Sequence, residues 1–228
     1  MHTAVSEITQ KNEIKASVAT GTEAFGIQGS YALTKSIGVI GGFSWGSNDV
    51  FSLSEDAYLK NGTRTNWELG IGYYHPISPV VTFEVFGGID RFHRDYIMTD
   101  FNYSDTAVFN FTKTFIQTDI GFLNKKKNGL GLSCKFGYDI YDHSFFIHGD
   151  EWQYPYMHPY IRTSFQNFYQ IEPSLTWRFG WRKLNFQVQT GYYFQNNKII
   201  PSQDYVFKGY GDDNWFIDFG LCLHLFTE

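Results

Sequence analysis

The chain has 228 residues, of which 43% are hydrophobic, 20% aromatic and 18% charged, and its formal net charge is -5. One domain is the default at this length, so we treat 1–228 as a single domain. So many aromatic residues argue against intrinsic disorder. The acidic balance argues against a nucleic-acid partner, which favours a basic face. Two cysteines exclude a disulfide scaffold and a cysteine-based zinc module.

The sequence offers neither a membrane-spanning helix nor a secretion signal. A spanning helix needs a run of about 18 apolar residues, and the chain has none. The opening residues Met1, His2 and Thr3 lead into a polar stretch. If the protein is exported, we expect its signal to have been removed or replaced.

Alternation of apolar and polar residues with period two dominates the chain. In residues 130–140, for example, Leu130, Leu132 and Phe136 lie on one face while Ser133 and Lys135 lie on the other. This alternation is typical of a strand with one apolar face. It predicts ten strands, at 12–21, 24–34, 36–47, 63–75, 80–94, 108–124, 129–142, 160–179, 183–195 and 214–226. Eight strands would follow if the first two segments were irregular.

The connections between these strands alternate in length, except that the first connection on the long side, Gly21 to Glu23, is short. Short ones follow residues 33, 75, 124 and 180, and long ones run over about 47–63, 94–107, 142–159 and 196–213. Short turns at one end and long loops at the other are typical of an outer-membrane barrel. The fold class is therefore all-β, as a single transmembrane antiparallel up-and-down barrel with both chain ends on the short-turn side.

Alternation alone does not say which face of the barrel points inward. A soluble barrel places its apolar face inside, whereas a membrane barrel places it outside. Aromatic residues such as Trp45, Tyr73, Trp177 and Trp215 crowd the expected strand ends, which is typical of the interfaces of a membrane barrel. We therefore expect the polar face to line the interior, with a soluble barrel as the alternative.

The polar face carries a network of charges. Its expected members are Lys15, Glu68, Glu84, Asp90, Asp119, Lys135, Asp139, Glu172, Arg178 and Asp218. If the turn after residue 124 centres on Lys127, Asp119 faces Lys135 across two neighbouring strands. A network that fills a narrow barrel is the favoured interpretation, and a cation-preferring pore is the alternative. Cys134 and Cys222 fall on opposite faces, so we expect no disulfide between them.

The expected loops carry apolar residues that favour contact with a partner. These residues are Phe145, Phe146, Ile147, Trp152, Ile199 and Ile200, and exposed apolar loop residues often mark contact surfaces. The loop at 142–159 also contains histidines and carboxylates, and His143 beside Asp142 could activate water in a rim hydrolase. Because the spacing fits no compact metal motif, we expect no metal and no other cofactor.

Several segments resemble uncharacterised outer-membrane β-barrels of the Bacteroidota. They are Lys11–Ala16, Tyr31–Val39, Glu68–Tyr74 and Phe83–Gly88, and Gly220–Phe226 resembles the C-terminal recognition signal of outer-membrane proteins. The final Thr227 and Glu228 depart from that signal, which normally ends on the aromatic residue. The resemblance implies a bacterial outer-membrane location, with membrane lipids as partners.

The sequence leads us to expect a non-enzymatic protein rather than a catalyst. We expect an accessory subunit that presents its extracellular loops to another outer-membrane or surface protein. A narrow, porin-like channel for small solutes is the alternative, and a rim hydrolase is less favoured.

Overall fold

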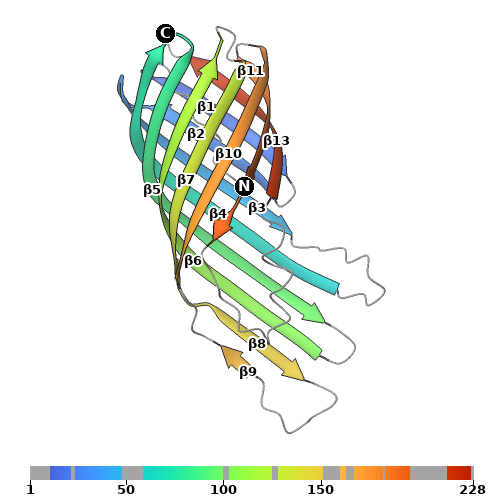
Figure 1. Cartoon of the computed structure of the whole chain (residues 1–228). Helices are drawn as coiled ribbons and strands as arrows, with labels where there is room; N and C mark the ends of the chain where they lie inside the picture. Colours follow the sequence, from blue (N-terminus) through green and yellow to red (C-terminus); the bar gives the residue numbers. More distant parts are fainter. Residues whose placement is uncertain are drawn as a thin grey trace.

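The computed structural model describes residues 11–21, 24–47, 59–99, 103–124, 128–150, 160–162, 167–181, 183–195 and 215–226. All regular structure in these ranges is β (Figure 1). The strands are β1 (Glu13–Gly21), β2 (Phe25–Ala32), β3 (Ile37–Ser47), β4 (Leu59–Ser78), β5 (Val81–Thr99), β6 (Tyr103–Leu123), β7 (Gly129–Tyr141), β8 (Phe145–Asp150), β9 (Tyr160–Arg162), β10 (Phe168–Trp181), β11 (Leu184–Tyr192), β12 (Phe194–Gln195) and β13 (Trp215–Phe226). Within the described ranges, no helix is long and apolar enough to cross a membrane.

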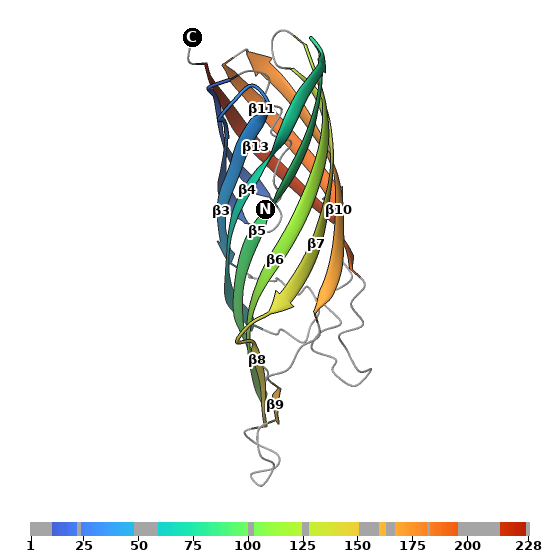
Figure 2. The ribbon, with the colours of Figure 1, turned by 90° about the vertical axis from the view of Figure 1, so that its left-hand side faces the viewer.

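Ten of these strands close into one antiparallel up-and-down barrel (Figure 2). The order around the barrel is β1, β2, β3, β4, β5, β6, β7, β10, β11 and β13, and β13 pairs with β1 to close it. The ten-strand all-β barrel predicted from the alternation is therefore confirmed. The eight-strand alternative is wrong, because β1 and β2 pair regularly from Ile14 opposite Tyr31 to Thr20 opposite Phe25.

One side of the barrel wall continues past the other as an extended sheet. β3 ends opposite Thr63, whereas β4 and β5 continue to the pair Leu59–Thr99. β6 carries the sheet onward to β8, and β8 pairs with β9. We call residues 59–62, 95–99, 103–108, 145–150 and 160–162 the outer sheet. In Figure 1 it extends beyond the end of β3 at the lower end of the barrel.

The outer sheet corrects three boundaries predicted from the sequence. The expected loop at 94–107 is a paired hairpin, in register from Arg94 opposite Phe109 to Thr99 opposite Ser104. The expected loop at 142–159 contains β8, so Phe145, Phe146 and Ile147 lie in a strand. The expected strand 160–179 is two strands, because β9 pairs with β8 outside the barrel and β10 begins at Phe168.

A local irregularity after β7 directs the chain into the outer sheet. Asp142 donates its backbone N–H to the Asn110 carbonyl oxygen over 2.8 Å, and the Ser144 hydroxyl donates to the same oxygen over 2.9 Å. Between them His143 has a φ of 47°, a left-handed conformation uncommon outside glycine. The chain then resumes pairing with β6 at Phe145 opposite Val108, so β8 continues the line of β7.

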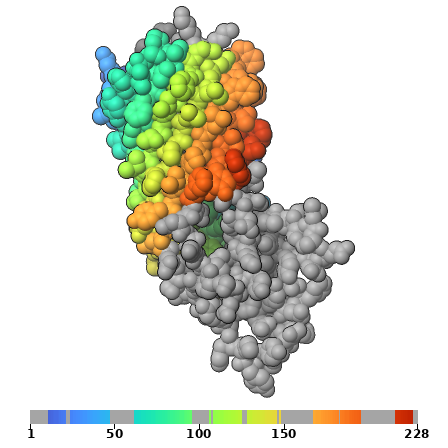
Figure 3. All heavy atoms as spheres, in the orientation of Figure 1, coloured from blue at the N-terminus to red at the C-terminus, as the bar shows by residue number. Residues whose placement is uncertain are grey.

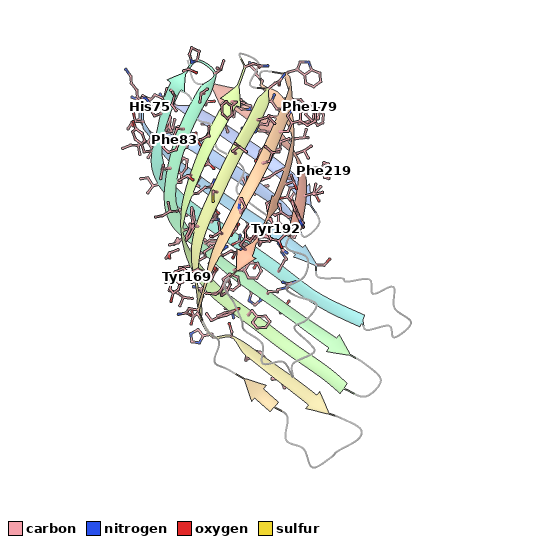
Figure 4. All side chains as sticks on the ribbon, in the orientation of Figure 1. His75, Phe83, Tyr169, Phe179, Tyr192 and Phe219 are labelled. Carbon is pink, nitrogen blue, oxygen red and sulfur yellow. The ribbon has the colours of Figure 1, made fainter. Side chains whose placement is uncertain are left out.

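Polar side chains point into the barrel and apolar ones point out. Along β7, Ser133, Lys135 and Asp139 are buried, whereas Leu132 and Phe136 are exposed. Strand geometry produces this separation, because successive side chains along a strand point to opposite faces of the sheet. Phe179 and Phe219 project from the outer surface in Figure 4. In the space-filling view, coloured side chains of neighbouring strands cover this side of the barrel continuously (Figure 3).

Candidate functional site

The candidate site is the charged interior of the barrel, together with the barrel mouth at the end from which the outer sheet extends. All ten charged residues predicted for the interior are at most 8% exposed. They fall on successive transverse rows of the barrel, which are set by the strand register. One row runs Glu68, Asp90, Lys113, Asp139 and Phe168 across β4, β5, β6, β7 and β10.

Two buried lysines form ion pairs within this network. The Lys135 ammonium hydrogen-bonds Glu68 and lies 3.5 Å from Asp90 Oδ2. The Lys113 Nζ lies 2.6 Å from Glu172 Oε1. Each ammonium therefore meets a carboxylate on another strand, which is how buried charges are tolerated in a protein interior.

The predicted pairing of Asp119 with Lys135 is wrong by two residues. The backbone N–H of Asn124 donates to the Asn128 carbonyl oxygen over 2.9 Å, so this turn centres on residue 126 rather than 127. Asp119 consequently faces Ser133, and Lys135 faces Gln117. The Gln117 side-chain amide donates to both carboxylate oxygens of Asp119, at 3.1 and 3.0 Å.

The remaining predicted interior charges are buried on other rows. Glu84 faces Asp119 across β5 and β6. Lys15 faces His224 across the closing pair of strands. Arg178 Nε donates to Gln187 Oε1 over 3.5 Å, and Asp218 is buried on β13 opposite Gly21.

Three further charged residues, not predicted from the sequence, are buried in the interior. They are Glu13, Arg64 and Lys113. Each stands an even number of residues from a member that was identified: Glu13 from Lys15, Arg64 from Glu68, and Lys113 from Asp119. Because side chains repeat with period two along a strand, this spacing alone could have found them.

The interior also contains an apolar cluster, formed by Ala32, Ile40, Tyr74, Phe86 and Phe115. Phe115 lies over Gly70 and Gly88, which face each other in β4 and β5. A Cβ at Gly88 would lie 2.7 Å from Phe115 Cζ, so glycine is needed for this close approach. The Lys135 Nζ lies 4.2 Å from the centre of the Phe115 ring, which links the cluster to the charge network.

A second aromatic group lies at the barrel mouth, and we call it the mouth cluster. Its members are Phe92, Phe109, Phe111, Tyr141 and Phe168. Phe92 and Phe111 stack with ring centres 4.5 Å apart. Tyr141 lies 5.8 Å from both Phe111 and Phe168. All except the buried Phe168 are half-buried, so the cluster borders the outside of the barrel.

The predicted rim pair lies on the outer surface. His143 Nε2 is 3.1 Å from Asp142 Oδ1, and the His143 side chain is 90% exposed. Arg91 also approaches Asp142, at 3.8 Å. The neighbouring Ser144 hydroxyl donates to a backbone carbonyl and accepts the Asn110 N–H, so backbone groups occupy it. The His143–Asp142 pair therefore lies at an open surface rather than in an enclosed site.

The other predicted positions are placed as follows. Phe145 and Ile147 are half-buried in β8, which also contains Phe146. Trp152, Ile199 and Ile200 lie outside the described residues. Among the described residues, no group of three or more His, Cys, Asp or Glu side chains is arranged to hold a metal ion.

No family model matches the sequence, and no curated protein matches it.

Proposed function

We propose that this protein is an integral barrel of a bacterial outer membrane, with a filled interior and a non-enzymatic role as a scaffold. In this role the outer sheet is the surface presented to a partner. The observation that carries the proposal is the inverted burial pattern: charged side chains are buried, and large apolar side chains are exposed.

The exposed apolar side chains support a lipid environment. Leu69 and Ile71 are each 58% exposed, and Trp215 is 66% exposed. Soluble monomers rarely expose a contiguous apolar patch larger than a few hundred Å², whereas here apolar residues face outward on strand after strand. Strands of about 11 residues, tilted near 45°, cross the roughly 25 Å apolar band of an outer membrane.

Exposed aromatic residues near the strand ends support the same orientation. Trp181 and Tyr73 lie close to the short turns, whereas Trp45, Trp215 and Tyr169 lie towards the opposite end. Tyrosine and tryptophan favour the interface between lipid and water because their rings are amphipathic. The two groups would therefore mark the two membrane surfaces.

The buried interior supports a scaffold rather than a channel. A water-filled channel would leave its lining side chains accessible to water, but Lys135, Asp139 and Glu172 are each at most 6% exposed. The apolar cluster around Phe115 adds an apolar layer within the same interior. Small barrels are readily filled by their own side chains in this way.

A narrow cation-preferring channel is the second candidate function. The observation that favours it is the excess of carboxylates over lysines and arginines among the buried residues. Planar-bilayer recording of the whole protein separates the two proposals. The scaffold proposal predicts no single-channel steps, and reproducible cation-selective steps would replace it with the channel.

The scaffold role is tested by shortening the outer sheet. Residues 96–107 would be replaced by an Asn-Gly hairpin turn, which joins the paired residues Asp95 and Val108. Complexes would then be extracted from outer-membrane fractions in mild detergent and identified by native-gel mass analysis. We expect a defined companion with the intact chain and its loss with the shortened one. A Lys183→Met variant, changed at an exposed turn at the other end, serves as the control and should keep the companion. Migration of the intact barrel alone would contradict the scaffold role.

A further inference from the structure

The chain passes from the barrel into the outer sheet through a β-bulge. β7 pairs with β6 as far as Tyr141 opposite Phe111, and β8 resumes the pairing at Phe145 opposite Val108. Three residues separate these two pairs on the side of β7 and β8, whereas two residues separate them on β6. One side of the ladder therefore holds one extra residue, which is the arrangement of a β-bulge.

The extra residue decides which face of the outer sheet receives the side chains of β8. Without a bulge, Phe145 would pair with Ala107 and share the face of Tyr141, which continues the barrel interior. With the bulge, Phe145 pairs with Val108 and lies on the opposite face, which continues the outer surface of the barrel. Ile147 lies on the same face as Phe145, and both are half-buried. A slip of one residue would move both side chains to the other face.

The Ser144 hydroxyl replaces a backbone acceptor within the bulge. In a regular antiparallel ladder, two facing residues can exchange both of their backbone hydrogen bonds. Here the Asp142 N–H donates to the Asn110 carbonyl oxygen over 2.8 Å, but the Asn110 N–H donates to Ser144 Oγ over 2.9 Å. The Ser144 hydroxyl donates in turn to the Asn110 carbonyl oxygen, and the Asn110 side-chain amide donates to the His143 carbonyl oxygen over 3.3 Å. Asn110 is therefore held to all three residues of the bulge.

His143 adopts the strained conformation that the bulge requires. Its φ of 47° lies in the left-handed region, where a residue other than glycine persists only if its surroundings enforce it. The His143 side chain is 90% exposed, so burial of the side chain does not enforce the conformation. The regular register would need no left-handed residue and is therefore the competing state. The hydrogen bonds of Asn110 and Ser144 oppose it.

We propose that the hydrogen bonds between Asn110 and Ser144 select the bulged register, and so determine that Phe145 and Ile147 lie on the outward face of the outer sheet. Ser144 is then a positioning residue for the surface that a partner would meet. The choice of register does not depend on membrane location. Its consequence for a partner rests on the scaffold role proposed above.

The test is disulfide trapping in the full chain, refolded in detergent micelles with Cys134 and Cys222 replaced by alanine. One chain carries Val108→Cys with Phe145→Cys, and these side chains face each other in the bulged register. A second chain carries Ala107→Cys with Phe145→Cys, which face each other in the regular register. A disulfide cannot bridge side chains that point apart, so each pair reports one register. We expect trapping of the 108–145 pair and none of the 107–145 pair.

Ser144→Ala should shift the balance towards the regular register, because the Asn110 N–H loses its acceptor in the bulge. Loss of this hydrogen bond corresponds to about a tenfold rise in the rate of 107–145 trapping relative to 108–145 trapping. His143→Val tests the same balance independently, because a β-branched residue disfavours the left-handed conformation, and it should raise the same ratio. His143→Gly should leave trapping at 108–145, since glycine adopts this conformation without strain.

Deletion of His143 is the matched control, because it removes the extra residue and makes the 108–145 register regular. Ser144→Ala should have no effect on the ratio in that chain. Heat-modified gel mobility checks that each barrel has folded. Trapping of the 107–145 pair in the otherwise unaltered chain, or an unchanged ratio in both Ser144→Ala and His143→Val, would overturn the proposal. The readout needs no companion protein, so a failed search for a companion would contradict the scaffold role and leave this result standing.

Discussion

Replacing Lys135 with Met should destabilise the barrel more than any change at its exposed turns. The lysine ammonium hydrogen-bonds Glu68 and lies 3.5 Å from Asp90, and all three side chains are at most 7% exposed. Methionine keeps most of the volume but leaves two carboxylates without their cation. Breaking a buried ion pair costs about 3–5 kcal/mol. We therefore expect the free energy of unfolding to fall by about 4 kcal/mol, equivalent to a factor of about 1,000 in the unfolding equilibrium.

The assay is urea unfolding of the barrel refolded into lipid vesicles, followed by tryptophan fluorescence and gel mobility. Adding Glu68→Gln to Lys135→Met should recover about 1–2 kcal/mol, because one of the two carboxylates that lost the Lys135 ammonium is then neutral. Lys183→Met, at an exposed turn, should change the free energy of unfolding by less than about 0.5 kcal/mol. A fall below about 1 kcal/mol for Lys135→Met would refute the reasoning, since that is the range of a solvated surface pair.

Two further predictions concern close packing and pH. Gly88→Val should lower the free energy of unfolding by at least about 1–3 kcal/mol, because a Cβ there would overlap the Leu69 carbonyl oxygen and lie 2.7 Å from Phe115 Cζ. In the same urea assay Gly29→Val should be tolerated, since its Cβ would meet only one backbone oxygen, at 3.6 Å. Partial burial alone would raise the pKa of Asp95, but hydrogen bonds from the Thr63 N–H and hydroxyl, at 2.6 and 2.7 Å, outweigh it and lower the pKa below its ordinary value. This contact is therefore complete above the ordinary carboxyl pKa and is lost as pH falls through the lowered one. The NMR signal of the Thr63 amide should shift with pH with a midpoint below pH 3.8. A midpoint at or above that value would contradict the hydrogen bond from Thr63 to Asp95.

The strands and the separation of their apolar and polar faces were predictable from local alternation, whereas the choice of the inward face also needed the aromatic residues at the strand ends. Side chains alternate along a strand, so Leu132 and Ser133 had to point to opposite sides wherever the strand lay. The register depended on the centre of a turn. A shift of that centre from residue 127 to 126 moved Asp119 from Lys135 to Ser133.

The outer sheet was not predictable from the same pattern. Beyond residue 94, β5 and β6 pair as a hairpin past the end of β3, and β8 joins them by pairing with β6, from Tyr103 opposite Asp150 to Val108 opposite Phe145. The β6–β8 pairing joins residues far apart in the chain, which local alternation does not predict. The course of Lys113 shows the same limit. Its position on the interior face follows from period two, but its choice of Glu172 over Asp139 depends on the space above Gly137 on the neighbouring strand.

Spin labels at two adjacent residues would test whether lipid surrounds the apolar outer face of the barrel. Leu132 is 51% exposed on the outer face and Ser133 is 8% exposed in the interior. Each would be replaced singly by a labelled cysteine, in a chain whose Cys134 and Cys222 are replaced by alanine, and measured in vesicles of outer-membrane lipid. The account predicts that oxygen, which dissolves in lipid, reaches the label at 132 far more often than a water-soluble nickel complex does, and that neither reaches the label at 133 freely. Ready access of the nickel complex to the label at 132 would contradict it.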